Sequence, residues 1–386
     1  MLAAVVVSAG ALAATGALAL PAGAVTAHPV SASTNAHKLT VRQIAFGKKL
    51  HHLFRPDGKG ALHSEVLTDP DDITTIGRDV YVTFQNAVGP QGEASPDGNL
   101  DSTLVEFTLS GREVRQWDVP GHCDGLTADP LIGKVIATIN EDANSSIFTI
   151  TVATDRLTHY RFNEPLPHKG GTDAISIYQG HILISASAPG TTGAPAPKAS
   201  YPAVYVTTLN TKTKIATVRP LFYDEWLARE VNGPDAGKLV HLALTDPDSN
   251  EVVPWVSPRF GGDFMLDSQG DRELIFDRPT DFWHVGLSVL HLTRSVDDSA
   301  WATSPFGALY TTDATADTVD TVSGRFAVGT MYSAVTPCDE NSAPATCPGP
   351  GFPANYLATD NLRTGALTRV PLAGAPLNPK GMIFIR

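Results

Sequence analysis

The hydrophobic and polar residues of this chain repeat one pattern, which is an acidic residue, a short apolar run, a turn and a second apolar run. Four segments show it most clearly, and they read PDDITTIGRDVYVTF from Pro70, HCDGLTADPLIGKVIATI from His122, GTDAISIYQGHILISAS from Gly171 and VDDSAWATSPFGALYTTD from Val296. Short apolar runs separated by turn residues are typical of β-strands rather than helices. The sequence therefore predicts an all-β protein.

The length of the repeat predicts how the strands are arranged. Asp72 and Asp124 are 52 positions apart, and Asp124 and Asp173 are 49 positions apart. A period near 50 residues with four strands in each repeat is typical of a β-propeller, in which sheets pack around an axis because one sheet alone cannot bury both of its faces. We expect six blades of four antiparallel strands. Seven blades are the alternative, if the segment after Thr318 contains another sheet.

The two ends of the chain are expected to close the ring together. The last segment, NPKGMIFI, resembles the first strand of a repeat, with Lys380 near the acidic position, but no further strands follow it. The N-terminal segments VRQIAF, KKLHHLF and SEVLT can supply them, and such closure removes an exposed sheet edge. Another repeat is expected to start at GGDFMLDSQGDRELIF, which places Asp263 in the acidic position.

The first residues are typical of a segment for export. Leu2 to Leu20 is apolar and uncharged, and the small residues that follow at 22–27 resemble a cleavage site of a secretory signal peptide. An uncleaved membrane anchor is the alternative, but the Ala and Gly content makes the run weakly hydrophobic. We expect a signal peptide at residues 1–27, a flexible leader at 28–40 and the propeller at 41–386, in a secreted protein.

The charge of the chain narrows the partners that it can have. The formal net charge is −12, which argues against nucleic acid, since nucleic-acid binding rests on neutralising phosphates with Lys and Arg. An acidic, exported chain suits the binding of cations. We expect a monomer that makes no contact with a membrane once the signal peptide is removed.

Three cysteines are present. Cys338 and Cys347 bracket the loop CDENSAPATC, and in an oxidising compartment we expect them to form a local disulfide. Cys123 remains, and it is expected to be a buried thiol within a strand, with a reactive thiol as the alternative.

The recurring acidic residues are the main candidates for chemistry. The first strand of each propeller blade lines the axis, so residues at one end of these strands converge. Several carboxylates that lie close together cannot all stay ionised without a counter-charge, and Ca²⁺ or Mg²⁺ supplies one through oxygen ligands. The alternative is that each Asp caps the turn before its strand. We expect a divalent cation, Ca²⁺ first, and its predicted ligands are Asp72, Asp124, Asp173, Asp263 and Asp298.

A histidine precedes one of these acids. His122 lies two positions before Asp124, and an imidazole there can exchange protons near neutral pH, so we predict His122 and Asp124 as catalytic residues. The sequence has no G-x-S-x-G, H-E-x-x-H or P-loop motif, which leaves the commonest serine hydrolases, zinc peptidases and nucleotide-binding proteins without support.

The segments PDDITTIGRDVYVTF and VDDSAWATSPFGALYTTDATADTV resemble the repeats of bacterial propellers of the NHL, YVTN and senescence-marker-protein/gluconolactonase-like kind. In the gluconolactonase-like enzymes an axial divalent metal is held by a Glu, Asn residues and an Asp that also acts as base, whereas this chain carries mainly Asp at such positions. The resemblance implies a metal-dependent hydrolase of lactones or other esters. Two alternatives are a non-catalytic extracellular propeller that binds a small molecule or a cell-surface ligand, and a lyase that acts on cyclic antibiotics.

Overall fold

The computed structural model of the protein describes residues 38–167, 170–187, 200–278, 286–336 and 355–386. The expected signal peptide, most of the leader, and both Cys338 and Cys347 lie outside these residues. The described residues contain strands and short 3₁₀ turns and no α-helix. None of their helical segments is long and apolar enough to cross a membrane. The 3₁₀ turns are Gly47–Lys49, Pro56–Gly58, Val152–Thr154 and Gln269–Asp271.

The first three repeats form antiparallel units of four strands, as the sequence predicts. The first contains β4 (Pro70–Ile76), β5 (Asp79–Phe84), β6 (Asp101–Thr108) and β7 (Glu113–Pro120). The second contains β8 (Cys123–Asp129), β9 (Lys134–Ile139), β10 (Ser146–Thr151) and β11 (Arg156–Phe162). The third contains β12 (Ile175–Tyr178), β13 (His181–Ser185), β14 (Pro202–Asn210) and β15 (Ile215–Tyr223). A short parallel contact between β11 and β15 joins the second and third units into one eight-stranded sheet.

The other sheets depart from four strands. A six-stranded sheet has the order β17-β16-β21-β20-β19-β18, and its strands are β16 (Leu227–Glu230), β17 (Leu239–His241), β18 (Pro247–Val252), β19 (Phe264–Ser268), β20 (Glu273–Asp277) and β21 (Leu287–His291). The next sheet consists of β22 (Ser295–Trp301), β25 (Met331–Thr336), β26 (Tyr356–Asp360) and β27 (Leu367–Arg369). The closing sheet has the order β28-β1-β24-β23-β29, with β1 (Leu39–Phe46), β23 (Ala308–Asp313), β24 (Thr318–Ser323), β28 (Leu372–Gly374) and β29 (Met382–Ile385).

The closing sheet contains strands from both ends of the described chain, which confirms that expectation. Only the first of the three N-terminal segments joins it, as β1. The other two pair with each other as the separate hairpin of β2 (His51–Phe54) and β3 (His63–Val66). The prediction that they extend the closing sheet is therefore wrong.

The last two sheets exchange strands along the sequence. The chain passes from β22 to β23 and β24 in the neighbouring sheet, returns as β25, β26 and β27, and then crosses again to β28 and β29. The two apolar runs of VDDSAWATSPFGALYTTD therefore belong to different sheets, and the expectation that they pair with each other is wrong. β23 pairs with β29 on one side and with β24 on the other, so the run ALYTTD completes the repeat that begins at NPKGMIFI.

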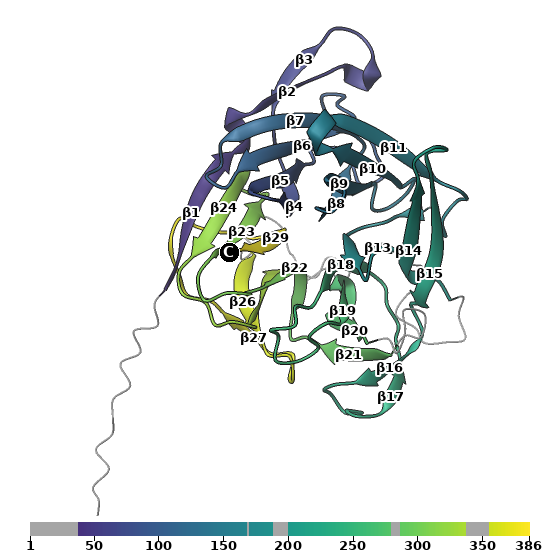
Figure 1. Cartoon of the computed structure of the whole chain (residues 1–386), viewed down its shortest axis with the longest axis vertical. Helices are drawn as coiled ribbons and strands as arrows, with labels where there is room; N and C mark the ends of the chain where they lie inside the picture. The colour runs from purple at the N-terminus through teal and green to yellow at the C-terminus, as the bar shows by residue number, and fades with distance from the viewer. Residues whose placement is uncertain (1–37, 168–169, 188–199, 279–285, 337–354) are drawn as a thin grey trace, which may run out of the picture. The chain divides into compact units, whose positions relative to one another are not determined.

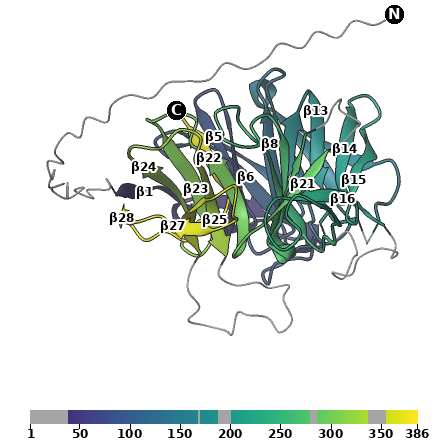
Figure 2. The same ribbon diagram turned by 90° about the horizontal axis from the view of Figure 1, so that it is seen from below.

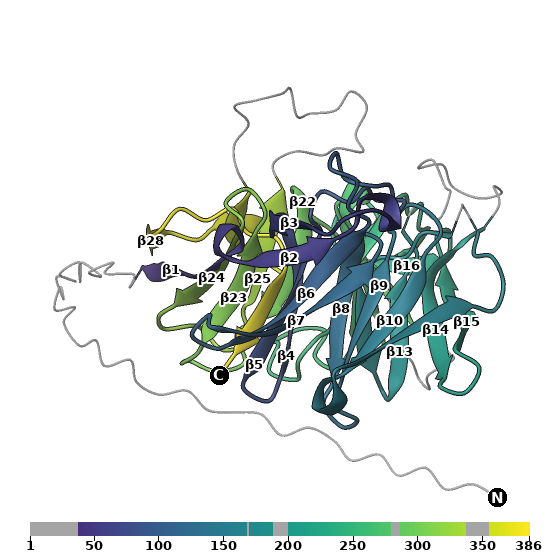
Figure 3. The same ribbon diagram turned by 90° about the horizontal axis from the view of Figure 1, so that it is seen from above.

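The sheets of the unit His37–Arg386 surround a central axis (Figure 1). Six strands line this axis in the described residues, and each lies beside the next in the closed order β4, β8, β12, β18, β22, β29 and back to β4. Side views show the strands running between two ends that carry the loops (Figure 2 and Figure 3). The arrangement is that of a β-propeller.

Buried apolar clusters fill each space between consecutive sheets. For example, Tyr81 of β5 and Leu126 of β8 share one cluster, whereas Val80 of β5 and Tyr310 of β23 share another. Equivalent clusters lie at the other four junctions. Each sheet thus covers the face of its neighbour, which is how a ring of sheets removes apolar area from water.

A β-bulge marks the start of four of the six axis-lining strands, β4, β8, β18 and β22. In β4, Asp71 and Asp72 together lie opposite the single residue Thr83, and in β8 Asp124 and Gly125 lie opposite Thr138. The same register shift occurs in β18 and β22. A bulge turns two successive side chains away from the strict in-and-out alternation, so each strand presents a pair of residues to the centre of the ring.

Candidate functional site

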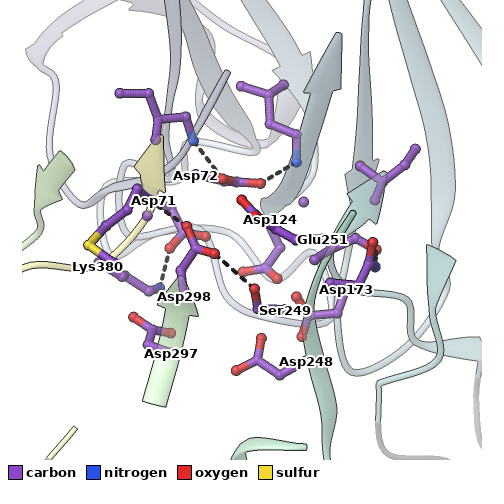
Figure 4. A pocket seen from close by; sticks show the side chains of 18 of the residues that line it. Asp71, Asp72, Asp124, Asp173, Asp248, Ser249, Glu251, Asp297, Asp298 and Lys380 are labelled. Atoms are coloured by element: carbon purple, nitrogen blue, oxygen red, sulfur yellow. Dashed lines mark hydrogen bonds and ion pairs between the residues drawn. The ribbon is translucent and has the colours of Figure 1, made fainter. Parts of the chain in front are cut away.

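The start of the six axis-lining strands surrounds a cavity of about 830 Å³. Its wall is strongly acidic, and Figure 4 shows the carboxylates pointing toward one another from several strands. The labelled residues of this wall are Asp71, Asp72, Asp124, Asp173, Asp248, Ser249, Glu251, Asp297, Asp298 and Lys380.

The bulges assign these residues to two positions. The first position of the bulge carries Asp71, Asp124, Asp248 and Asp297, and Asp173 and Lys380 hold the equivalent place just before β12 and β29. The second carries Asp72, Gly125, Ala174, Ser249, Asp298 and Gly381. The repeat in the sequence aligns Asp72 and Asp298 with Asp124 and Asp173, and the structure shows that this alignment is one residue out in those two strands. Consecutive acids, as in Asp71-Asp72, left the choice open.

Asp72 and Asp298 are bound to backbone amides across the sheet boundaries. The carboxylate of Asp72 accepts hydrogen bonds from Ile73 N at 2.6 Å and from Leu126 N, on the next axial strand, at 2.6 Å. Asp298 likewise accepts from Ser299 N at 2.6 Å and from Met382 N of β29. These two predicted metal ligands line the cavity and, in this structure, join neighbouring sheets.

Gly125 and Gly381, at the second of the two positions, lie where neighbouring axial strands approach each other closely. A Cβ on Gly125 would lie 2.4 Å from the carbonyl oxygen of Asp173, and one on Gly381 would lie 2.4 Å from that of Asp71. The hydroxyl of Thr138 donates to the Asp173 carbonyl at 2.6 Å. The missing side chain therefore lets the next strand approach closely, which fixes the position of the following acid.

The structure does not bring Asp263 to the cavity. The axis-lining strand of its sheet is β18, so the acid that reaches the centre there is Asp248, and Asp263 precedes the second strand, β19. Its carboxylate pairs with Arg278 Nε at 2.6 Å. The expectation that Asp263 begins an axis-lining strand is wrong, because the segment PDSNEV before it forms that strand despite having a single strongly apolar residue.

One cation lies among these acids. Lys380 is the only Lys or Arg among the described residues of the cavity wall, and its ammonium pairs with Asp71. Burial lowers the pKa of Lys380, but the charges of Asp71, Asp297 and Asp124 outweigh it and raise the pKa well above its ordinary value. Lys380 is therefore charged and offsets part of the negative charge of the wall.

Asp124 lies between two other carboxyl groups. It hydrogen-bonds with Asp173 and with Asp71, and Gln85 Nε2 bridges Asp71 at 2.7 Å and Asp124 at 3.3 Å. Burial raises the pKa of Asp124, but the hydrogen bond with Asp173, the charge of Lys380 and the hydrogen bond with Asp71 lower it to about 2. Burial and the charge of Asp124 raise the pKa of Asp173. The negative charge of this group is therefore concentrated on Asp124.

His122 presents one ring nitrogen to this charge. Its Nδ1 lies 2.6 Å from the carbonyl oxygen of Val88, which can only accept, so Nδ1 carries the proton. Nε2 then lies 4.0 Å from Asp124 Oδ1 and 3.5 Å from Glu141 Oε1. A carbonyl that fixes the tautomer in this way is a common feature of metal-binding histidines, because it aims the lone pair of the other nitrogen at the ion.

His122, Asp124 and Glu141 form a set that suits a metal ion. One ligand atom from each lies within 4.8 Å of the others, and His122 and Asp124 are buried. The set mixes one nitrogen with carboxylate oxygens, which suits Zn²⁺ and the neighbouring first-row ions better than Ca²⁺, whose ligands are oxygens. The residues present therefore fit a divalent ion at the cavity wall.

Sequence reasoning missed Glu141, Asp248, Asp297 and Asp71. Glu141 follows β9, which runs antiparallel to β8, so it returns to the end of the sheet where His122 and Asp124 start. An acid directly after the second strand of a repeat was the signal that could have found it. Cys123 is fully buried beside this site, and burial raises the pKa of its thiol, which agrees with an unreactive cysteine in a strand.

No protein-family model matches the chain, and no curated protein matches it significantly. Solved structures similar to it include a protein of unknown function from Bacteroides caccae, at 10% identity and a TM-score of 0.44, over 90% of this chain and 99% of that one. Another is the periplasmic gluconolactonase of Pseudomonas aeruginosa, at 10% identity and a TM-score of 0.43, over 90% and 99% of the two chains. The β-propeller domain of Swd1 from Myceliophteria thermophila has 12% identity and a TM-score of 0.37, over 85% and 95%. Likeness at this level does not transfer an activity.

Proposed function

We propose that this chain is an exported, six-bladed propeller that hydrolyses a lactone or another small ester with the help of a divalent metal ion. Each axis-lining strand would head one blade. The observation that carries the proposal is the convergence of His122 Nε2, Asp124 and Glu141 within 4.8 Å at the wall of the acidic cavity. The imidazole favours Zn²⁺ or Mn²⁺ over the Ca²⁺ expected from the sequence.

The residues around this set have distinct roles in the proposal. When bound, the ion would polarise the carbonyl oxygen of the substrate. Asp173, which carries the proton of its hydrogen bond with Asp124, is placed to donate that proton to the leaving alkoxide oxygen and to recover one from the attacking water molecule. The ammonium of Lys380, held by Asp71, is placed to stabilise the negative charge that develops on oxygen.

Metal analysis of matched variants tests the first part of the proposal. The protein is stripped with a chelator, dialysed against Zn²⁺, Mn²⁺ or Ca²⁺ and analysed by mass spectrometry. We expect stoichiometric Zn²⁺ or Mn²⁺ in the native chain and its loss in His122→Ala and Glu141→Gln. His63→Ala, in the exposed part of β3, is the control and should bind normally. Absence of a stoichiometric ion from the native chain would contradict the proposal.

Hydrolysis tests the second part. Loaded protein is offered aldonolactones and simple aryl esters, and acid release is followed with a pH indicator. Activity should require the metal and fall at least tenfold in Asp173→Asn, whose metal content should be retained. Stoichiometric metal with no hydrolysis of any substrate would favour the alternative of a binding propeller, in which the same carboxylates and Lys380 hydrogen-bond a polyhydroxylated ligand.

A further inference from the structure

The end of the ring opposite the acidic cavity carries exposed apolar side chains. The three most exposed large apolar residues among the described residues are Leu131 at 95%, Trp255 at 85% and Phe306 at 71%. Each lies on a loop that follows an axis-lining strand, namely β8, β18 and β22. Because the acids of the cavity lie at the start of these strands, the loops that follow the strands leave from the other end.

Local hydrogen bonds fix these loops. Leu131 N donates to the carboxylate of Asp129 at 3.0 Å, and Phe306 N donates to the hydroxyl of Ser304 at 3.2 Å. In the Trp255 loop, Gly262 N donates to Val253 O at 2.8 Å. The three exposed side chains are therefore held at the tips of loops that local hydrogen bonds keep in a defined conformation.

Positive charge accompanies the apolar side chains near Trp255. Arg259 and Arg363 line a second cavity of about 480 Å³, formed by the loop after β18, the start of β25 and the turn after β26. Arg259 is oriented by a hydrogen bond to Leu362 O at 2.8 Å and lies over the ring of Phe260 at 4.6 Å. Neither guanidinium forms an ion pair with another described residue.

The acids of this cavity do not cancel that charge. Asp360 is its one carboxyl group, and burial raises the pKa of Asp360 to about 7. Asp263 of the same loop is already paired with Arg278. The whole chain carries a net charge of −12. The cavity lined by Arg259 and Arg363 is nevertheless positively charged and therefore attracts anions.

We propose that this end of the ring docks on an anionic phospholipid surface, with Leu131, Trp255 and Phe306 in the interface and Arg259 and Arg363 against headgroup phosphates. The apolar residues come from three strands spaced around the ring, so they offer separate points to a plane rather than a continuous groove for a protein chain. Aromatic and aliphatic side chains beside arginines are the combination that binds an anionic bilayer surface. The inference is independent of the proposed hydrolase and departs from the expectation of no membrane contact.

Vesicle sedimentation with the purified protein tests this proposal. We expect at least tenfold stronger binding to vesicles containing phosphatidylglycerol than to pure phosphatidylcholine, and weaker binding at high salt. The triple variant Leu131→Ser, Trp255→Ser and Phe306→Ser should lose at least tenfold in binding, and Arg259→Gln with Arg363→Gln should lose the preference for anionic lipid. The control is Leu227→Ser with Leu239→Ser, which removes two exposed leucines of β16 and β17 and should bind like the native chain.

Several outcomes would overturn the proposal. One is native protein that stays in solution with both kinds of vesicle, and another is a triple variant that binds as well as the control. Displacement by millimolar inorganic phosphate, without any difference between the two lipids, would make the arginine cavity a site for a free anion. Binding to an acidic glycan or protein in place of the vesicles would equally reject a lipid surface. Thermal unfolding followed by circular dichroism shows whether each variant remains folded.

Discussion

The carboxylate of Asp72 and the backbone N–H of Leu126 are joined by a hydrogen bond of 2.6 Å across the boundary between two sheets. The bond links β4 to β8 at the wall of the cavity, where the Asp72 side chain is partly buried. Asp298 and Met382 repeat the arrangement between β22 and β29. Two acids that the sequence offers as metal ligands are thus also connectors between sheets.

Asp72→Ala should destabilise the protein by about 3 kcal/mol, since two buried backbone N–H groups lose an acceptor. Asp298→Ala should cost a similar amount, and Asp72→Asn less, because one oxygen remains. Urea denaturation measures the free energies of unfolding. Asp97→Ala, in an exposed turn, is the control. A loss below about 0.5 kcal/mol in both alanine variants, the range of ordinary surface substitutions, would show that these bonds do not hold the sheets together.

Gly125→Ala should cost about 2 kcal/mol or more, because its Cβ would lie 2.4 Å from the backbone oxygen of Asp173 and 2.5 Å from the Thr138 hydroxyl. The strand β12 must shift, so the variant should also bind metal more weakly. The control is Gly89→Ala, whose new methyl group would meet mainly the flexible carboxylate of Glu93. Chemical denaturation and metal titration of both variants separate the two effects. Equal stability of Gly125→Ala and the control would contradict the close approach of the strands.

The sequence predicts the repeated sheets well where each repeat is continuous. In the segments from Pro70, His122 and Gly171, the pattern of apolar residues is enough to predict both the strands and their pairing. Strands that follow one another in these segments also lie side by side in the sheet. The prediction fails at Asp263, because the axial strand of that sheet, β18, reads PDSNEV. This strand is buried by its place at the centre of the ring, and its few apolar residues give no strand pattern. The prediction also fails at Val296, where the strand exchange depends on pairing between distant segments that no local pattern records.

The sequence predicts only those site residues that lie directly before a recognisable strand. Asp124, Asp173 and His122 are predicted from their place before a strand, and the structure brings Asp124 and Asp173 to one cavity, with His122 beside Asp124. Asp71 and Asp297 were missed because a bulge shifts the register by one residue, and a bulge in an Asp-Asp pair leaves no mark in composition. Glu141 was missed because it arrives from a different strand of the same sheet.

Lys380→Met should destabilise the metal-free protein by about 3 kcal/mol at neutral pH, since removal of one partner leaves buried carboxylates without their cation. The loss should shrink as the pH falls, because protonation of the carboxyl groups removes the uncompensated charge. Thermal denaturation over a pH series measures this. Lys238→Met, which removes an exposed lysine paired with Asp235, is the control. A pH-independent loss would indicate that the Lys380 stem matters for packing alone.

His52 should make the protein more stable in mild acid. Its Nε2 lies 2.7 Å from Glu65 and its Nδ1 lies 3.4 Å from Asp118. Burial lowers the pKa of His52, but hydrogen bonds and charges from Asp118 and Glu65 outweigh it and raise the pKa. A raised pKa means that the folded state favours the charged ring, so this stabilisation is complete below the ordinary pKa of 6.5 and is lost as the pH rises through the folded value.

The comparison of His52→Gln with the native chain measures this contribution. Their difference in free energy of unfolding should be largest below pH 6.5 and should diminish toward alkaline pH. His51→Gln, on the exposed side of the same strand, should leave the pH profile unchanged. A difference that grows with pH would reverse the sign and reject the charged form.

The exchange of strands between the last two sheets has a consequence for biosynthesis. The closing sheet cannot be completed until β28 and β29 have been synthesised, because β29 supplies the axial strand beside β23. The segment just before β29 delivers Lys380, the single Lys or Arg that the described residues contribute to the cavity wall. During translation the acidic residues of the earlier strands therefore repel one another without a counter-charge, and ring closure coincides with their neutralisation. Loss of β29 alone should thus leave the ring open between β22 and β4 rather than trim an outer edge.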